Sequence, residues 1–513
     1  MTANLGDFLR RRAWRDPNVE AVVEPHSGTR TTFEQLNQRI NKTANMLASV
    51  GVSKGDRVGS LLMNGLPLVE TVFANAKLAS VNVALNWRLT ADELEFILKD
   101  SGTTVLIFND EFLPTVAELH ARGDAIDVTQ WLQVGGETAD FAHSYEELVT
   151  QQSDAEPEIG GGDDDLLFIM YTSGTTGLPK GVMHSHNTVA WACITQRASL
   201  PFENDERFLI SLPLFHVGAL TPLFTNAYYG FTSVITSTFE PNDCWATIDQ
   251  EGITGTLLVP AMLLAMKAVY DPNTHKHDKL RNVISGAAPV PVALIEDYKK
   301  LGITINQVYG MTETCGPGCI IIGQDAIDRP GSTGRGYFHT DVRVVGSDGK
   351  DCNPGEAGEV WMRAPNNMVG YWNRPDATAE TIIDGWVLSG DVAVMDEDGF
   401  VTIVERVKDM LISGGENVYP AEIENVLLGH DGIADAAVIG VPSEKWGESA
   451  MAVIVKADQA LDEQSVIHFT KGKLAAYKSI KVVRFTDVIP RNPSGKILKR
   501  ELREQYPDIE APE

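Results

Sequence analysis

One stretch of the chain, YTSGTTGLPKG at residues 171–181, combines residue types that bind phosphate. Its glycines let backbone N–H groups turn toward one point, its hydroxyls add hydrogen-bond donors, and Lys180 adds a positive charge. The apolar run LLFIMY before it, from Leu166 to Tyr171, is typical of a buried strand. We therefore interpret the stretch as a phosphate cradle at a strand end rather than as a flexible surface loop.

The spacing in this loop differs from that of the Walker phosphate loop, which needs Gly-Lys followed directly by Ser or Thr. Here two residues separate Gly177 from Lys180, and Gly181 follows the lysine. A P-loop kinase is therefore a poor interpretation. The residues expected to surround phosphate are Thr172, Ser173, Gly174, Thr175, Thr176, Gly177 and Lys180.

A second candidate site follows the predicted strand ITINQVYG, where Thr312 and Glu313 stand just beyond the strand end. Strand ends are where α/β proteins bind ligands. A carboxylate suits Mg²⁺, which typically takes one or two carboxylates together with phosphate oxygens. A helix-capping threonine followed by a solvated glutamate is the alternative interpretation.

Four other patterns are weak when each is taken alone. Residues 285–289, SGAAP, could let a flat ring lie against the backbone, and Asp391 in LSGD could accept both hydroxyls of a ribose. Residues 413–417, SGGEN, could form a second Gly-rich surface, and Lys496 lies in the turn-like RNPSGK. Taken alone, SGAAP, Asp391 and Lys496 are each better explained by an ordinary turn, and a simple turn is the alternative for SGGEN.

The elements that must position these residues fall into three kinds. The chain has 513 residues, which predicts two or more domains. Strand and helix patterns alternate through about residue 310, which indicates α/β layers, and residues 331–405 read as an antiparallel β unit. After Arg406 comes a third kind of segment, with a helix over 419–430. We interpret residues 151–165 as a surface loop leading into the phosphate strand rather than as a domain linker.

The charge of the chain restricts its partners. There are 42 Lys and Arg against 70 Asp and Glu, a net charge of −28, which argues against nucleic acid and against docking on anionic lipid. Residues 471–503 reverse the sign, with ten basic residues against two acidic ones. Such a run is either a solvated face or a region that meets a polyanionic small ligand.

No membrane span or leader is expected. The most apolar stretch, residues 209–224, is too short to span a bilayer and is interrupted by two prolines. The arginines at 10–12 are not followed by an apolar segment, so we expect a cytoplasmic protein without a signal peptide.

Cysteine and histidine spacing gives no metal site. Five cysteines without a C-x-x-C pair indicate neither a disulfide framework nor bound zinc. The histidine pairs His184 with His186 and His275 with His277 are interpreted as loop residues.

Taken together, in this order and spacing, the segments resemble the adenylate-forming superfamily, which contains acyl-CoA synthetases, amino-acid adenylation domains and beetle luciferases. The matching stretches cover nearly the whole chain: YTSGTTGLPKG, YGMTET, GYW (Gly370 to Trp372), SGD, ERVKDMLISGGENVYPAEIE and NPSGK. The resemblance favours the acyl-CoA synthetase, or fatty-acid–CoA ligase, branch.

This resemblance implies an α/β multidomain fold. It has a large N-terminal domain of layered α/β sheets with a small β-barrel-like unit, followed by a small mobile α+β domain. The implied boundaries are 1–406 for an AMP-binding and acyl-binding domain, 407–409 for a hinge at Lys408, and 410–513 for a C-terminal lid domain that carries the catalytic lysine.

The resemblance also implies roles for individual residues. Thr312 would touch the α-phosphate and the acyl carboxylate, Glu313 would hold Mg²⁺, and Lys496 would bridge carboxylate and α-phosphate. Further ATP- or AMP-binding residues would be Gly286, Ala287, Ala288, Asn306, Gln307, Tyr309, Gly310, Asp391 and Arg406. The acyl pocket would be formed by His216, Val217, Gly218, Gly286, Gly310, Met311 and Gly316. Coenzyme A would meet Gly414, Gly415, Trp446, Tyr477 and Lys481.

Two departures from the family pattern are small. Ser389 replaces the commoner threonine before Gly390-Asp391, and Glu405 replaces the usual glycine or aspartate before Arg406. The second departure leaves the geometry of the hinge open.

The implied activity is that of an ATP-dependent acyl-CoA synthetase with ATP, Mg²⁺ and coenzyme A. No acid stands at Phe215-His216 to pair a substrate ammonium, so a free amino acid is not expected. An apolar acid is expected, first a medium- or long-chain fatty acid and second an aryl acid such as a benzoate or cinnamate. A nucleotide-binding module without turnover is the alternative from a different class. The expected partners are small molecules, with a homodimer also allowed.

Overall fold

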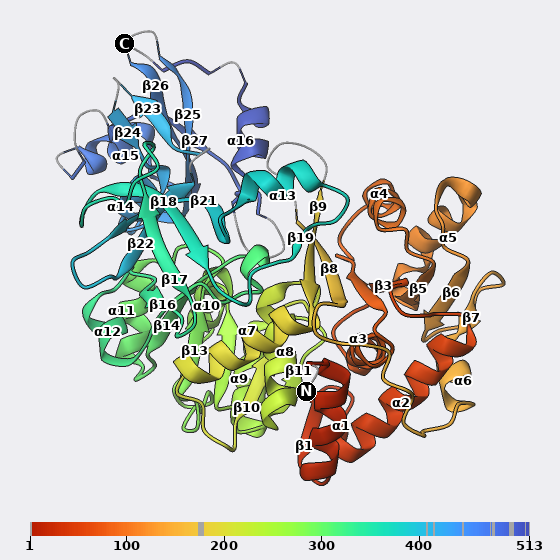
Figure 1. Ribbon diagram of the computed structural model, residues 1–513. Helices are drawn as coiled ribbons and strands as arrows, with labels where there is room; N and C mark the ends of the chain where they lie inside the picture. The colour runs from red at the N-terminus through yellow and green to blue at the C-terminus, as the bar shows by residue number, and fades with distance from the viewer. Residues whose placement is uncertain are drawn as a thin grey trace.

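The computed structural model describes most of the chain, and Figure 1 shows its course. The described residues are 3–172, 179–406, 409–413, 416–443, 446–471, 473–474, 478–491, 497–507 and 509–511, with residues 406, 416 and 417 described by their backbone only. Within these residues the strands form four sheets, of nine, eight, five and five strands. We name them sheets A, B, C and D.

Sheet A carries strand ends that belong to the predicted nucleotide site. Its central strands run parallel, whereas the pairs β1–β2, β14–β15 and β15–β16 are antiparallel. Across the sheet the strands are β16 (Arg335–Gly336), β15 (Cys319–Ile321), β14 (Ile305–Tyr309), β13 (Asn282–Ser285), β12 (Gly255–Leu258), β10 (Arg207–Ile210), β11 (Thr232–Ile235), β1 (Glu20–Glu24) and β2 (Thr29–Thr32).

Sheet B contains the two strands that flank the predicted phosphate loop. It is parallel from β8 through β7, and β9 and β19 add to it in antiparallel fashion. Across the sheet the strands are β19 (Gly370–Tyr371), β9 (Lys180–Ser185), β8 (Leu166–Thr172), β4 (Val81–Ala84), β3 (Arg57–Leu61), β5 (Val105–Asn109), β6 (Gln130–Val134) and β7 (His143–Ser144).

Helices separate and cover these two sheets, and strand alternation explains why both faces are apolar. The largest core cluster joins helices to sheet A through Phe208 and Ile210 and to sheet B through Ile107, whereas Leu209 faces a second core on the opposite side of sheet A. The helices between the sheets are α1 (Leu5–Arg15), α2 (Phe33–Ser49), α3 (Leu66–Leu78), α7 (His186–Ser199) and α8 (Val217–Tyr229). The outer helices are α9 (Pro241–Gln250), α10 (Pro260–Ala268) and α11 (Val292–Lys300) on sheet A, and α4 (Ala91–Ser101) and α5 (Leu113–Ala121) on sheet B.

Local sequence signals fix several helix starts. The predicted capping box at the start of α2 is confirmed, because Thr32 Oγ1 accepts from Gln35 N at 3.3 Å and Gln35 Oε1 accepts from Thr32 N at 3.0 Å. Such a cap contributes about 1 kcal/mol to the stability of the folded protein. Thr90 with Glu93 opens α4 in the same way.

The segment 151–165 is confirmed as a loop that packs onto the N-terminal layers. Glu156 lies in this loop, and its carboxylate pairs with the buried Lys77 ammonium of α3. Lys77 Nζ also donates to Asn41 Oδ1 at 2.7 Å. Because a buried lysine needs such partners, the loop is tied to α2 and α3 rather than hanging between domains.

Sheet C is the antiparallel unit predicted for residues 331–405. Its strands are β17 (Asp341–Val345), β18 (Ala357–Arg363), β21 (Trp386–Met395) and β20 (Ile382–Ile383), with β22 (Val401–Arg406) paired to β21. Among the smaller helices, α6 (Tyr145–Thr150) contacts β6 and β7 of sheet B, α12 (Gly323–Asp328) contacts β14 of sheet A, and α13 (Pro375–Thr381) contacts β20 and β21 of sheet C.

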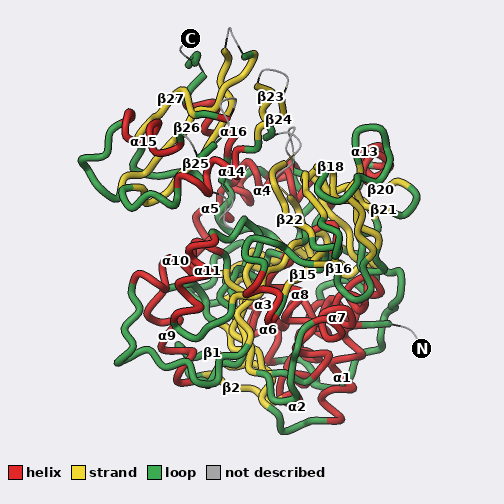
Figure 2. The backbone as a smooth tube through the Cα atoms, turned by 90° about the vertical axis from the view of Figure 1, so that its left-hand side faces the viewer, coloured by secondary structure: helices red, strands yellow, loops and turns green. Residues whose placement is uncertain are grey.

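Sheet D belongs to the C-terminal part of the chain, drawn in blue at the top of Figure 1 and again uppermost in Figure 2. Its strands are β24 (Glu416–Val418), β23 (Leu411–Ser413), β26 (Gly447–Lys456) and β25 (Ile433–Ser443), with β27 (Ile480–Phe485) paired to β26. The helices of this part are α14 (Pro420–Leu427), α15 (Glu463–Thr470) and α16 (Lys499–Gln505). Separate cores on its two faces give this part its own hydrophobic packing. In the described residues, no helix is both long enough and apolar enough to cross a membrane.

Candidate active site

Two neighbouring parallel strands, β13 and β14, end side by side and carry part of the predicted nucleotide site. Ser285 on β13 pairs with Gln307 on β14, and both side chains are buried. Ser285 Oγ and Gln307 Nε2 have no hydrogen-bond partner among the described residues. Asn306 instead has a structural partner, because its Oδ1 accepts from Gly323 N at 3.2 Å. Since buried polar atoms are rarely left without partners, this edge has the chemistry of a site for a polar ligand such as a nucleotide base.

Close backbone packing shapes the turn that follows β13. A Cβ at Gly286 would lie 2.5 Å from Val308 O, so only glycine fits without a shift. Ala287 adopts a φ of 68°, in the left-handed region that is costly for a residue with a Cβ. Ala288 follows in the same bend. The predicted ring-binding turn is therefore tight and held in a strained conformation, as is common at ligand sites.

The predicted ribose carboxylate, Asp391, lies next to the end of β14. Tyr309 Oη donates to Asp391 Oδ2 at 2.7 Å; Asp391 is buried and Tyr309 is partly buried. Burial and the neighbouring Asp391 charge raise the pKa of Tyr309, so the hydroxyl stays protonated and keeps donating. On β21 and β22, Asp391 pairs with Arg406 through the backbone register. The structure thus brings together Tyr309, Asp391 and the backbone of Arg406.

The two ends of the phosphate loop lie opposite each other, because Thr172 on β8 pairs with Lys180 on β9. Lys180 Nζ lies 5.0 Å from the centre of the Tyr371 ring, within cation–π range. Tyr371 Oη in turn donates to Glu313 Oε1 at 2.8 Å. The structure therefore places Lys180 over the ring and Glu313 at the hydroxyl of one tyrosine, for which no role was predicted from the sequence.

Glu313 fits the predicted role of a magnesium ligand. It lies in the 3₁₀ turn Thr312–Thr314 and is buried, with its backbone oxygen accepting from Met368 N at 2.7 Å. The described residues contain no group of three or more His, Cys, Asp or Glu side chains that could hold a metal by themselves. A site with one carboxylate suits Mg²⁺, which takes most of its remaining ligands from substrate phosphates and water.

The interpretation of His184 and His186 as loop residues is wrong, because both are buried, His184 on β9 and His186 at the start of α7. His184 Nε2 donates to Thr312 O at 2.7 Å, and burial lowers the pKa of His184 to about 4. His184 therefore supports the backbone of Thr312 as a neutral side chain. The signal for it was the strand-like run KGVMHS after the phosphate loop, which the sequence analysis did not use.

Of the residues predicted for the acyl pocket, Gly310 and Gly316 lie beside the start of α8. A Cβ at Gly316 would lie 3.9 Å from both Val217 and Thr221, and Thr221 Oγ1 donates to Cys315 O at 2.9 Å. A Cβ at Gly310 would lie only 1.6 Å from Gly316 O. Gly310 and Gly316 therefore bring two backbone segments into direct contact beside α8.

Two more of the predicted pocket residues lie close by. At Gly218 a Cβ would meet its nearest neighbours, Leu212 and Leu257, only at 3.8 and 3.9 Å, which leaves room in an apolar setting. Met311 packs against a small core under sheet C, and its N donates to Thr314 Oγ1 at 3.2 Å.

His216 stands at the N-cap position of α8 without a side-chain capping hydrogen bond, and its Nε2 is buried without a hydrogen-bond partner among the described residues. Burial, helped by the charge of Arg88, lowers the pKa of His216 to about 4. Arg88, which the sequence analysis missed, lies 4.0 Å from the Trp87 ring centre and 5.9 Å from that of Phe215. The surroundings of His216 are thus apolar and aromatic, with a neutral histidine and a nearby guanidinium.

The residues predicted to bind coenzyme A lie in the C-terminal part. Trp446 stands directly before β26, with its N donating to Ser443 Oγ at 3.3 Å, and Lys481 is half-buried on β27. The following predicted residues lie outside the described part of the chain: Ser173, Gly174, Thr175, Thr176, Gly177, Lys408, Gly414, Gly415, Tyr477 and Lys496.

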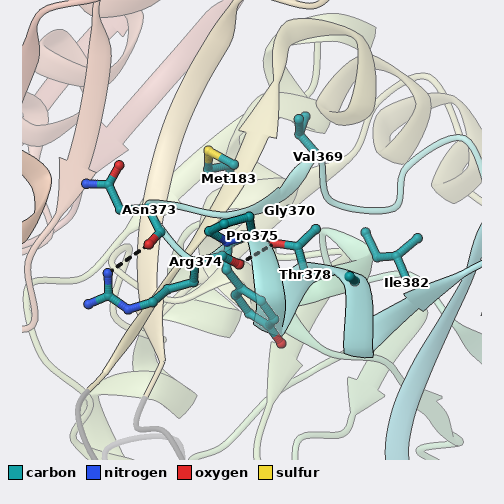
Figure 3. Close-up of a pocket in the computed structure, with 10 residues that line it drawn as sticks. Met183, Val369, Gly370, Asn373, Arg374, Pro375, Thr378 and Ile382 are labelled. Atoms are coloured by element: carbon teal, nitrogen blue, oxygen red, sulfur yellow. Dashed lines mark hydrogen bonds between the residues drawn. The ribbon is translucent and has the colours of Figure 1, made fainter.

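A groove of about 540 Å³ opens beside Tyr371, between β9, β19 and α13 (Figure 3). Its lining includes Met183, Val369 and Ile382, and it is held by a hydrogen bond from Tyr371 N to Thr378 Oγ1 at 2.9 Å. Neither Glu313 nor Asp391 lines this groove, so it adjoins the candidate site rather than forming it.

Comparison with known proteins agrees with this geometry. Residues 9–372 match the family described as AMP-binding enzyme, and residues 422–496 match the AMP-binding enzyme C-terminal domain. The chain is 41% identical over 504 residues to the long-chain-fatty-acid–CoA ligase FadD13 of Mycobacterium tuberculosis, covering 98% of each. It is also 41% identical over 505 residues to a feruloyl-CoA synthase of Amycolatopsis sp, covering 98% of this chain and 99% of that one.

A solved structure extends the likeness to the fold. The anthranilate CoA ligase AuaEII, in complex with anthranoyl-AMP, superposes with a TM-score of 0.92 at 27% identity, covering 98% of this chain and 97% of that one. The chain therefore belongs to the AMP-binding enzyme family and, within the adenylate-forming superfamily, to the acyl-CoA synthetase branch of AMP-forming acid–thiol ligases.

Proposed function

We propose that this protein converts an apolar carboxylic acid, first of all a medium- or long-chain fatty acid, into its coenzyme A thioester through an acyl adenylate. What supports the substrate class is the apolar segment at the start of α8, which we propose as one wall of the acyl pocket. There Val217 and Gly218 stand among apolar residues, with no carboxylate in the stretch Phe215–Gly218. An apolar chain gains about 0.8 kcal/mol for each buried methylene, so such a wall favours apolar acids.

The same wall disfavours a free amino acid as the substrate. A buried ammonium needs a carboxylate partner. Arg88 lies near His216 instead, and its positive charge would repel an ammonium. The proposal therefore excludes amino-acid activation by charge as well as by the absent acid.

An aryl acid is the second candidate. The rings of Phe215 and His216 lie with centroids 4.5 Å apart, and Trp87 meets Phe215 edge-on with centroids 6.1 Å apart. Aromatic side chains in these arrangements suit a flat ring as well as an alkyl chain. The equal identity to a fatty-acid ligase and to a feruloyl-CoA synthase does not favour either class.

The proposed reaction has two steps. A carboxylate oxygen of the acid attacks the α-phosphorus of ATP, and the bond to the pyrophosphate oxygen breaks, which leaves an acyl adenylate and pyrophosphate. The thiol sulfur of coenzyme A then attacks the acyl carbon, its proton is lost, and AMP leaves with the bonding electrons. No side chain has to form a covalent bond, so positioning and electrostatics carry the catalysis.

The chain's own residues would divide this work. Lys180 and the loop before it would hold the outer phosphates, and Asp391 would accept the ribose hydroxyls. His184 would keep Thr312 fixed toward the α-phosphate through the 2.7 Å bond to Thr312 O. Mg²⁺, when bound at Glu313, would neutralise charge on the phosphate oxygens.

Lys496 would act in the first step, adenylation, and would move away from the acyl carbon before the second step, thiol attack. We propose that the C-terminal domain, residues 410–513, rotates about Lys408 in a hinge at 407–409. The reason is that the acyl carbon must lie near Lys496 during adenylation, whereas thiol attack needs a tunnel for the thiol at the same place. Gly414 and Gly415 would line that tunnel, with Trp446, Tyr477 and Lys481 meeting the nucleotide of coenzyme A. Lys496→Ala should reduce adenylation about a hundredfold or more and spare thiol attack on a supplied adenylate.

The experiment that tests the substrate class is a panel of acids from acetate to octadecanoate, together with benzoate, cinnamate and ferulate. Pyrophosphate release is measured with and without coenzyme A at saturating ATP. The proposal predicts the highest kcat/KM with a straight-chain acid of eight or more carbons. A maximum with an aryl acid would replace it by the second candidate, and no acid-dependent release would favour a nucleotide-binding module without turnover.

A further inference from the structure

Asp100, in the last turn of α4, is the meeting point of two distant segments of the chain. Its Oδ2 accepts from Tyr171 Oη at 2.7 Å, and its Oδ1 pairs with Arg374 Nη2 at 2.7 Å. Its backbone oxygen accepts from Trp372 Nε1 at 2.9 Å and from Asn373 Nδ2 at 3.2 Å. Four donors thus converge on one residue, whose side chain is 11% exposed. We name Asp100 with these four partners the Asp100 junction.

The helix itself does not explain an aspartate at this position. α4 ends at Ser101, and the helix dipole disfavours a negative charge in the last turn. The last carbonyl groups of a helix have no partner within the helix, and Trp372 and Asn373 supply two donors to the carbonyl of Asp100. The partners outside α4 therefore explain Asp100 better than the helix does.

The Asp100 junction reaches both strands that flank the predicted phosphate loop. Tyr171, near the end of β8, pairs with Gly181 on β9, which directly follows Lys180. Trp372 N donates to Gly181 O at 2.7 Å. A Cβ at Gly181 would lie 3.0 Å from Tyr171 Cζ and 3.3 Å from Trp372 Cβ, so both side chains pack directly over this glycine. The two side chains therefore restrain the backbone that carries Lys180.

The same contacts act on the carboxylate proposed to hold Mg²⁺. Trp372 directly follows Tyr371 in the chain, so holding Trp372 at Asp100 also restrains Tyr371. The hydroxyl of Tyr371 donates to Glu313 Oε1 at 2.8 Å, and its ring lies 5.0 Å from Lys180 Nζ. The side chains proposed for the metal and for the outer phosphates therefore share one support, the Asp100 junction.

The charges at the Asp100 junction keep its hydrogen bonds in place. Burial and the hydrogen bond to Asp100 raise the pKa of Tyr171, so the hydroxyl stays protonated and keeps donating. Arg374 balances the charge of the carboxylate, and its Nη1 also donates to Asn373 O at 3.0 Å (Figure 3). Hydrogen bonds that involve ionised groups are stronger than those between neutral groups. The Asp100 junction is therefore suited to hold both segments in a fixed geometry.

We propose that Asp100 is a positioning residue for ATP, because it holds the two segments that present Lys180 and Glu313 to the phosphates and to Mg²⁺. One segment is the end of β8 at Tyr171, and the other is residues 370–374. This inference rests on the proposed function. A residue that only fastened α4 to the edge of sheet B would affect stability alone. The affinity for ATP, compared with the affinity for the acid, separates the two roles.

The test measures ATP binding and turnover on the full chain. The dissociation constant for ATP with Mg²⁺ is measured by titration calorimetry without acid, and the KM values for ATP and for dodecanoate are measured by pyrophosphate release. The variants are Asp100→Ala, Tyr171→Phe and the double variant, and melting temperatures show whether each one folds.

Glu251→Ala is the matched control. The side chain of Glu251 is 10% exposed and pairs with Arg207 at 2.7 Å, so the environment is similar to that of Asp100. Arg207 begins β10, whereas the candidate site lies where the parallel strands β13 and β14 end. The control pair therefore stands at the opposite edge of sheet A from the site.

Asp100→Ala should raise the dissociation constant and the KM for ATP about tenfold, as expected for the loss of hydrogen bonds to a charged group, and leave the KM for dodecanoate within about twofold of wild type. Tyr171→Phe should raise both ATP constants about threefold and add little in the Asp100→Ala background, because the two changes remove the same bond. Glu251→Ala should lower the melting temperature without changing ATP binding.

An Asp100→Ala protein that binds ATP as tightly as wild type would overturn the inference, and so would the same loss of ATP binding in Glu251→Ala or an equal rise in the KM for dodecanoate. If Asp100→Ala does not fold, Tyr171→Phe, which lacks a single oxygen, decides the question by the same measurements. A wild-type protein that binds ATP but releases no pyrophosphate with dodecanoate or cinnamate would overturn the proposed function alone. The calorimetric comparison of wild type with Asp100→Ala would then still decide the role of Asp100.

Discussion

The hydroxyl of Tyr371 provides a direct test of how Glu313 is held. Tyr371→Phe removes one oxygen and, with it, the 2.8 Å hydrogen bond to Glu313 Oε1. Glu313 is 8% exposed, so water does not readily replace the lost donor. Hydrogen bonds to charged groups contribute about 1.5–3 kcal/mol. If this energy serves to orient the carboxylate in the transition state, adenylation should fall about tenfold to a hundredfold.

The chain offers a matched control for this variant. Tyr145 Oη donates to Glu70 Oε2 at 2.7 Å, and this pair is also buried, between α3 and α6. Tyr145→Phe removes a bond of the same kind and should cost similar stability, measured by chemical denaturation. It should leave adenylation within about twofold of wild type, because a bond that does not change during the reaction does not affect the rate.

The assay for both variants is pyrophosphate release at saturating ATP and acid, titrated with Mg²⁺. Tyr371→Phe should raise the Mg²⁺ concentration needed for half-maximal rate as well as lower the rate itself. A Tyr371→Phe enzyme with wild-type rate and wild-type Mg²⁺ dependence would refute the reasoning. Equal loss of activity in Tyr371→Phe and Tyr145→Phe would also refute it, since stability alone would then explain both.

Three further predictions rest on contacts described above. Gly310→Ala should lower the free energy of unfolding by about 3 kcal/mol, measured by urea denaturation, because its Cβ would lie 1.6 Å from Gly316 O. Asp391→Asn keeps one acceptor for Tyr309 but loses the charge, so the KM for ATP should rise about tenfold, within the range for one charged hydrogen bond, while the melting temperature changes little. Burial lowers the pKa of His184 and of His186 to about 4, so the unfolded chain takes up protons first as pH falls. The free energy of unfolding should therefore stay constant above about pH 7 and decrease by about 1–2 kcal/mol for each histidine by pH 5. In His186→Gln this decrease should be smaller, because one of the two histidines is gone.

Much of the fold could be predicted because its signals are local. The capping box of Thr32 and Gln35 opens α2 as expected, and the run before the phosphate loop forms β8. The buried strands of sheets A and B are continuous apolar runs with turn residues after them, which a single sequence displays. Glu313, a chemistry-bearing residue just beyond β14, could be identified for the same reason.

The supporting contacts could not be predicted because they join distant parts of the chain. Tyr371 reaches Glu313 across 58 positions, through the two-residue strand β19, which is too short to show any periodicity. Glu405 contacts Lys499, which lies 94 positions later in the sequence. Taken alone, each of the two has the sequence signature of a solvent-exposed charged residue. His184 was misread because a histidine by itself does not indicate burial; only the strand-like run KGVMHS around it indicated a strand.

The most direct test of the central claim identifies the products made from ATP when a carboxylic acid is added. The account predicts AMP and pyrophosphate in equal amounts, formed only with acid present, and an acid-dependent exchange of labelled pyrophosphate into ATP without coenzyme A. Formation of ADP and inorganic phosphate instead, or pyrophosphate release that does not depend on the acid, would contradict it.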